Sequence, residues 1–187
     1  MRYTIIALLL LGLTISAAAQ VQMNIGAGYF GHTLTHPGVV LEAEIAGTNS
    51  PGVSLFGRTD LGGYTHPRHD AGIFLDMSFG MRREFKSGLF LEESIGLGVL
   101  ESFVNSDGVY SVDDSGAVSA ASRRNPLDLM PSISLGIGYN LTRHSSQSLL
   151  IWVRPKIFWQ FPDRSISTTY VPVLQVGVTR AISIERD

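Results

Sequence analysis

The sequence contains no cysteine, and beyond residue 20 it has no long apolar run and no segment with the pattern of an amphipathic helix. Without cysteine the chain can be neither a disulfide-stapled secreted domain nor a lipoprotein modified at that residue. Charged residues make up 16% of the chain, and acidic and basic side chains nearly balance at a formal net charge of -2. This balance argues against nucleic acid as a partner, and no motif implies a cofactor.

The only long apolar segment stands at the beginning of the chain. Arg2 is followed by the apolar stretch Ile5–Leu13 and then by small residues up to Ala19, which is the order of a secretory signal peptide. The apolar stretch falls well short of the roughly 20 residues that a membrane-spanning helix needs. We therefore expect a signal peptide over residues 1–19 and one mature domain over residues 20–187.

Apolar and polar side chains alternate along much of this domain, and the clearest case is Pro131–Leu141. Its odd positions are apolar throughout, whereas its even positions carry serine, glycine or asparagine. Successive side chains of a strand point to opposite faces, so this segment has one oily face and one small or polar face. The same alternation predicts seven further strands, within Val21–Tyr29, Val39–Ile45, Val53–Tyr64, Ile73–Arg82, Leu89–Phe103, Leu149–Phe161 and Leu174–Thr179. The third of these is the weakest, because Phe56 stands among its polar positions.

The connections between these segments alternate in length. Three are compact, at Gly47–Gly52, Glu84–Gly88 and Thr142–Ser148. The longest is Asn105–Leu129, which lies at the opposite end of the strands. Outer-membrane barrels join their strands in this way, with short periplasmic turns and longer external loops. Lipid cannot hydrate unpaired backbone groups, so a sheet within it must close on itself. The sequence therefore predicts an all-β, eight-stranded antiparallel up-and-down transmembrane β-barrel in the outer membrane of a Gram-negative bacterium.

The chain resembles the small outer-membrane β-barrel family typified by the OmpX and OmpA membrane domains. The resemblance is carried by Gly72–Leu75, Phe85–Glu92, Gly96–Gly98 and Met130–Asn140. It implies the barrel architecture and location, and such motifs identify no particular activity.

A cluster of charged residues is expected on the inward face of this barrel. Its members are Glu42, Glu44, Arg58, Asp60, Asp76, Arg82, Glu92, Arg154 and Lys156. An eight-stranded barrel is just wide enough inside to be filled by side chains, so these charges should compensate each other in a polar plug. We expect packing to be their role, in place of an open pore, a proton path or catalysis.

Four histidines, His32, His36, His66 and His69, fall in the first two predicted external loops, where we expect solvated side chains. Their spacing matches no zinc motif. The long connection Asn105–Leu129 contains several aspartates, but not at the spacing of a calcium-binding loop, and we expect a mobile surface loop that could recognise an extracellular partner. No metal site is therefore predicted.

The sequence leaves two other functions open. Some eight-stranded barrels are lipid-modifying enzymes with a serine, a histidine and a carboxylate on the lipid-facing wall. Here the only adjacent histidine and serines, His144–Ser146, fall in a predicted periplasmic turn, and Glu93 and Glu101 interrupt the oily face of the fifth strand. A soluble periplasmic barrel would reverse the faces and bind an apolar ligand inside. We expect instead a monomeric, non-enzymatic barrel whose partners are membrane lipid and, through its loops, an extracellular molecule.

Overall fold

The structure is a computed structural model that describes eight ranges of the chain. These are residues 21–32, 36–65, 70–104, 110–113, 115–120, 127–141, 149–161 and 170–182. The predicted signal peptide lies outside them. Within these ranges, no helix is long and apolar enough to cross a membrane.

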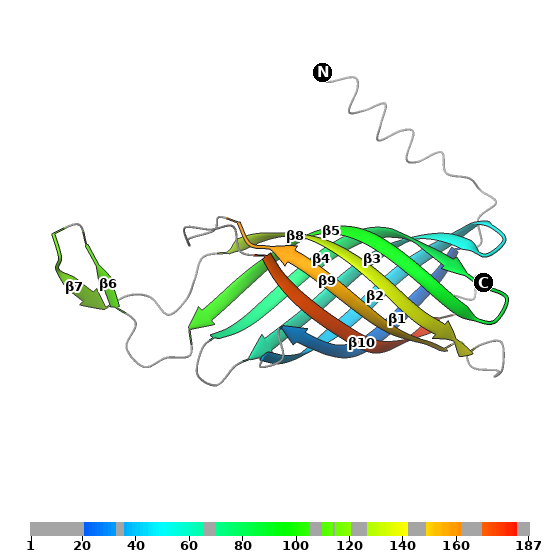
Figure 1. Cartoon of the computed structure of the whole chain (residues 1–187), viewed down its shortest axis with the longest axis horizontal. Helices are drawn as coiled ribbons and strands as arrows, with labels where there is room; N and C mark the ends of the chain where they lie inside the picture. The colour runs from blue at the N-terminus through cyan, green and yellow to red at the C-terminus, as the bar shows by residue number, and fades with distance from the viewer. Residues whose placement is uncertain are drawn as a thin grey trace, which may run out of the picture.

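Eight long strands form one closed antiparallel barrel (Figure 1). They are β1 (Val21–His32), β2 (His36–Ser50), β3 (Val53–Thr65), β4 (Asp70–Glu84), β5 (Leu89–Val104), β8 (Asp128–Asn140), β9 (Leu149–Trp159) and β10 (Tyr170–Ile182). Each strand pairs with its neighbours in the chain, and β1 pairs with β10, so the barrel has no free edge. The predicted up-and-down barrel of eight strands is confirmed.

The register of the strands fixes the tilt of the barrel. From Tyr29, the chain of paired residues that runs through β2, β3 and β4 reaches β5 at Glu101. The chain that runs the other way, through β10, β9 and β8, reaches β5 at Leu91. These two residues of β5 are ten positions apart, so neighbouring strands are staggered around the barrel. Such a stagger requires the strands to tilt by about 40° from the barrel axis.

Tight turns mark one end of the barrel, which we call the turn end. Residues Pro51 and Gly52 join β2 to β3, with φ of 78° at Gly52, and Phe85–Gly88 join β4 to β5, with φ of 92° at Gly88. Only glycine adopts such angles at little cost. The first turn is shorter than predicted because β2 continues to Ser50, and the third predicted turn, Thr142–Ser148, lies outside the described residues. We call the opposite end the loop end.

The outward face is mainly apolar on all eight strands. On β8 the side chains of Ile133, Leu135 and Ile137 are 45%, 61% and 46% exposed, while the residues between them point inward. Soluble proteins rarely expose an apolar area larger than a few hundred Å² in one patch. The predicted orientation, with the oily face outward and the charged face enclosed, is confirmed, and the reverse orientation of a soluble ligand-binding barrel is not the one observed.

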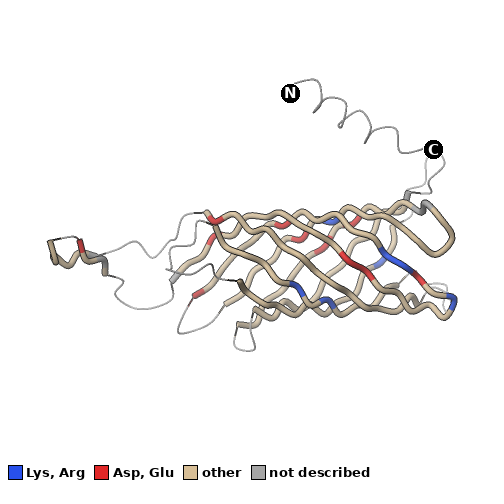
Figure 2. Tube along the Cα trace, turned by 45° about the horizontal axis from the view of Figure 1, so that its top comes forward, with Lys and Arg blue, Asp and Glu red and all other residues tan. Residues whose placement is uncertain are grey.

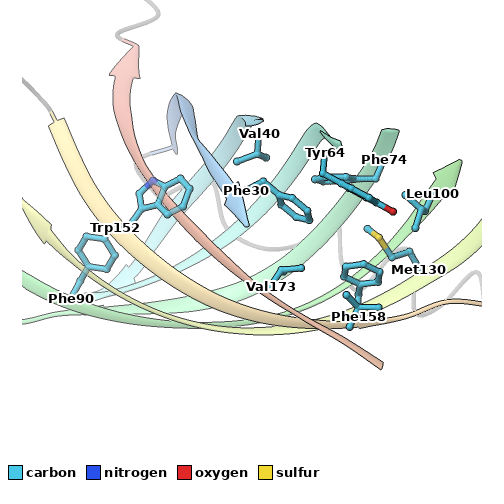
Figure 3. Close-up of a cluster of buried hydrophobic side chains, with 11 residues drawn as sticks. Phe30, Val40, Tyr64, Phe74, Phe90, Leu100, Met130, Trp152, Phe158 and Val173 are labelled. Atoms are coloured by element: carbon cyan, nitrogen blue, oxygen red, sulfur yellow. The ribbon is translucent and has the colours of Figure 1, made fainter. Parts of the chain in front are cut away.

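The interior also contains an apolar layer that the sequence reasoning did not predict (Figure 3). Near the loop end, inward side chains of most strands pack together, and they include Phe30, Phe74, Leu100, Met130 and Phe158, each at most 2% exposed. The rings of Phe30 and Phe74 lie 4.6 Å apart. The nine charged residues lie between this layer and the turn end, where Phe90 and Trp152 also point inward.

Candidate functional site

All nine charged residues predicted to face inward do so. Each is at most 7% exposed, and together they come from five of the eight barrel strands. Acidic and basic positions lie on neighbouring strands along the barrel (Figure 2). The structure divides them into two groups that share the interior.

The larger group is centred on Glu92, whose carboxylate receives hydrogen bonds from three arginines. Arg58 Nη2 and Arg154 Nε donate to Oε1 at 2.9 and 2.8 Å, and Arg82 Nε and Nη2 donate to Oε2 at 3.0 and 2.8 Å. The three arginines lie on β3, β9 and β4, so one carboxylate on β5 ties strands from both sides of the barrel together.

Two further carboxylates complete this group. Glu44 accepts hydrogen bonds from Arg82 at 2.7 Å and from Arg58 at 3.1 Å. Glu42 pairs with Arg154 at 2.8 Å and with Arg58 at 3.4 Å. Three carboxylates thus balance three guanidinium groups, which is the arrangement that makes buried charges tolerable.

The smaller group contains Lys156, Asp76 and Asp60. The ammonium of Lys156 lies 2.7 Å from Asp76 and 3.6 Å from Asp60, and the hydroxyl of Ser132 donates to Asp76 at 3.1 Å. Asp60 and Asp76 are register partners on β3 and β4, so two carboxylates face one ammonium group.

Aromatic rings cover the faces of the guanidinium groups. Phe56 lies 4.4 Å below Arg58 and 5.1 Å below Arg82, and the ring of Trp152 lies 4.0 Å from Arg154. Stacking over a ring stabilises a cation that has lost its water. The aromatic residue among the polar positions of the third strand, which made its pattern weak, is therefore part of the charged site.

Neutral polar residues that were not predicted as members extend the site. Trp152 Nε1 donates to Thr179 Oγ1 at 2.7 Å, and Thr179 donates to Glu42 at 2.9 Å. Asn24 donates to Glu44 at 3.0 Å, and Gln175 accepts from Arg154 at 3.3 Å. Their inward positions on β1 and β10 follow from the alternation in the sequence, but their partners do not.

Inward glycines leave the space that these side chains occupy. A Cβ at Gly136 would lie 2.6 Å from Glu92 Cγ, and one at Gly96 would lie 2.9 Å from an oxygen of Asp76. Interiors are close-packed, so a side chain at either position would collide with a carboxylate. The arrangement packs paired charges into the interior of the barrel and can hold strands together.

Two of the four histidines are not solvated loop residues, and the prediction for them is wrong. His32 ends β1 and His36 begins β2, where the two residues are register partners. The ring of His32 is buried and lies parallel to that of Tyr64 at 4.1 Å, and His36 Nε2 lies 3.0 Å from Asp70. The alternation of inward and outward side chains continues to the ends of both strands, so these rings point inward and lie next to the apolar layer. His66 and His69 lie outside the described residues.

The long connection between β5 and β8 ends earlier than predicted, and its described residues form a hairpin. β8 begins at Asp128, and a separate hairpin is formed by β6 (Tyr110–Val112) and β7 (Val118–Ala120). Oδ1 of Asp113 accepts hydrogen bonds from the hydroxyl and N–H of Ser115 and from the N–H of Ala117, and these bonds hold the pKa of Asp113 below its ordinary value. The hairpin stands away from the barrel beyond the loop end (Figure 1).

No described residues form a cluster of three or more histidine, aspartate or glutamate side chains that could hold a metal ion. Glu93 and Glu101 both lie on the outward face of β5, as predicted, but His144–Ser146 lie outside the described residues. The serine, histidine and carboxylate arrangement of a lipid-modifying enzyme therefore lies partly outside the described residues.

The fold and the filled interior define a small eight-stranded β-barrel of the up-and-down class, which is the class that the sequence resembles. No protein-family model matches the chain, and comparison with curated proteins finds no match. Among solved structures, the chain is similar to Ail, the attachment invasion locus protein of Yersinia pestis, at 12% identity over 88% of this chain and 99% of that one, with a TM-score of 0.49. It is also similar to neisserial surface protein A, at 11% identity over 88% and 98%, with a TM-score of 0.47. A de novo designed transmembrane β-barrel is similar at 13% identity over 89% and 98%, with a TM-score of 0.44.

Proposed function

We propose that this protein is an integral outer-membrane barrel with a non-enzymatic role, closed inside by its charge network and presenting its loop end to the extracellular side. The observation that carries the proposal is the contrast between the two faces of the barrel. The outward face is mainly apolar on every barrel strand, and the inward face carries the charged residues.

The outer wall supports the membrane location. Side chains such as Val39, Met77, Phe79 and Ile95 are between 58% and 68% exposed, and they lie on three strands, β2, β4 and β5, of one continuous surface. Each would be favoured in hydrocarbon and disfavoured in water by about 1.5–3 kcal/mol. A closed sheet satisfies its backbone internally, which is the condition for spanning a bilayer.

The interior supports a structural role and not a transport role. Conduction of solutes needs an open path, whereas the three arginines and Lys156 are each at least 93% buried among their partners. Ion pairs that link β2, β3, β4, β5 and β9 across the barrel act as cross-braces for the sheet between the apolar layer and the turn end.

The β6–β7 hairpin supports a surface-interaction role. Tyr110, Val112 and Val118 are each about two-thirds exposed, at 67%, 67% and 66%. Val112 and Val118 are register partners and so share one face. An exposed apolar face on a hairpin whose turn is held by Asp113 is suited to contact another protein, and this is the part of the molecule we assign to an extracellular partner.

The absence of cysteine makes the topology testable by single-cysteine labelling. Val118→Cys places a thiol on the hairpin, and Lys86→Cys places one in the exposed β4–β5 turn as a matched control. In intact cells a membrane-impermeant maleimide is expected to label Val118→Cys only, and both variants are expected to be labelled after the outer membrane is permeabilised. The protein should also stay with the outer membrane during fractionation and alkaline washing. Release into the soluble fraction, or labelling of Lys86→Cys in intact cells, would contradict the proposal.

A further inference from the structure

The carboxylate of Glu93 lies on the outer wall of the barrel, among apolar side chains. Glu93 follows Glu92 on β5 but points outward, between its register partners Met81 and Leu135. Within the described residues its carboxylate takes part in no hydrogen bond or ion pair. It lies four residues from Leu89, about 10 Å from the turn end for a strand tilted by 40°. On the proposed function this is the lipid-facing wall on the periplasmic side, where an unpaired charge is costly.

A groove in the wall runs past this carboxylate. It is lined by Leu55, Phe79, Met81, Glu93, Ile95, Ile133 and Leu135 together with the small inward residues Gly80, Ser94 and Ser134. Apart from Glu93 its outward walls are purely apolar. A surface of this kind suits a hydrocarbon chain, with one anionic group beside it.

A cation stands close by, between this carboxylate and the turn end. Arg83 is exposed on β4, one outward position beyond Met81, and its guanidinium lies 5.7 Å from the ring centre of Phe85. Because Met81 pairs with Glu93, Arg83 and Glu93 are diagonal neighbours on the same face, about 7–8 Å apart. The wall therefore presents an acidic group and a basic group side by side, next to an apolar groove.

We propose that this surface binds one phospholipid with a primary-amine headgroup, and the inference rests on the proposed membrane location. The phosphate accepts from Arg83, the ethanolamine arm turns back along the wall so that its ammonium donates to Glu93, and one acyl chain lies in the groove past Phe79 and Ile95. Both charges of the headgroup are then compensated, as is the wall carboxylate.

The charge pair selects among lipids. A quaternary ammonium, as in phosphatidylcholine, has no N–H to donate to Glu93. An anionic headgroup without an amine, as in phosphatidylglycerol, leaves Glu93 uncompensated beside a second negative charge. A primary amine is the headgroup chemistry that satisfies both residues.

Lipid retention by the purified full-length barrel tests the inference. Native mass spectrometry of the folded protein in detergent micelles would compare phosphatidylethanolamine, phosphatidylcholine and phosphatidylglycerol with identical acyl chains. The wild type is expected to retain phosphatidylethanolamine about tenfold better than phosphatidylcholine, the worth of one charge-assisted hydrogen bond. Glu93→Gln should abolish that preference. Arg83→Gln should weaken retention of all three lipids.

Glu101→Gln is the matched control, because Glu101 is an outward carboxylate on the same strand near the loop end. It should leave the preference unchanged. Equal retention of the three lipids by the wild type would overturn the inference, as would a preference that survives in Glu93→Gln, and heat-modifiable gel mobility confirms that each variant is folded. Because retention is measured in micelles, these results are separate from the labelling experiment that tests membrane location.

Discussion

Replacing Glu92 with glutamine is expected to destabilise the barrel strongly. The substitution keeps the shape of the side chain but removes the charge that faces Arg58, Arg82 and Arg154, and its amide nitrogen must point a donor at one of these donors. Breaking a buried ion pair on one side costs about 3–5 kcal/mol. Folded proteins are stable by only about 5–15 kcal/mol, so the effect is large. At about 2 kcal/mol per molar urea, the unfolding midpoint should fall by about 2 M.

Urea unfolding of the protein refolded in lipid vesicles, followed by tryptophan fluorescence and gel mobility, measures this shift. Glu93→Gln is the sharpest control, since the same change is made one residue away on the opposite face, and it should be neutral or stabilising. Adding Arg82→Gln to Glu92→Gln should restore the charge balance and recover more than 1 kcal/mol relative to additive losses, roughly the size of coupling between contacting residues. Equal midpoints for the two single variants would refute the account of a cross-braced interior.

Two further predictions follow from the packing. Gly138→Ala should be severely destabilising, because its Cβ would lie 2.4 Å from a backbone oxygen of Ile151. Gly57→Ala should raise stability by about 0.5–1 kcal/mol, because no atom lies within 4 Å of its Cβ. The urea midpoint measures both effects, and equal effects would contradict the packing. In planar bilayers the wild-type protein should give no large, regular conductance steps, and such steps would show that the charged interior is not a plug.

The alternation of side chains was sufficient to predict the barrel, because a strand in a closed sheet with an apolar exterior and a filled interior has only two kinds of position. The period of two in Pro131–Leu141 states which residues face out without any knowledge of the neighbours. The same information placed all nine charged residues inside. It also explains the errors near the loop end, where both faces of a strand become apolar, as at Ile73 and Phe74, and the alternation no longer separates them. His32 was misplaced for this reason.

The ion-pair partners could not be predicted from the sequence. The face on which a side chain lies depends on its position in its own strand, whereas its partner depends on how distant strands pair. Glu92 and Arg154 are 62 residues apart, and their contact depends on the register of every intervening strand pair. A shift of one residue in any pair would move all side chains of a strand to the opposite face. The charge network therefore opposes such slippage, since slippage would turn Glu92 and Arg82 to the apolar outward face while drawing Leu91 and Arg83 inward. On this argument the interior charges specify the register of the sheet as much as they stabilise it, which is why a single carboxylate that joins strands from both sides of the barrel is the most informative residue to change.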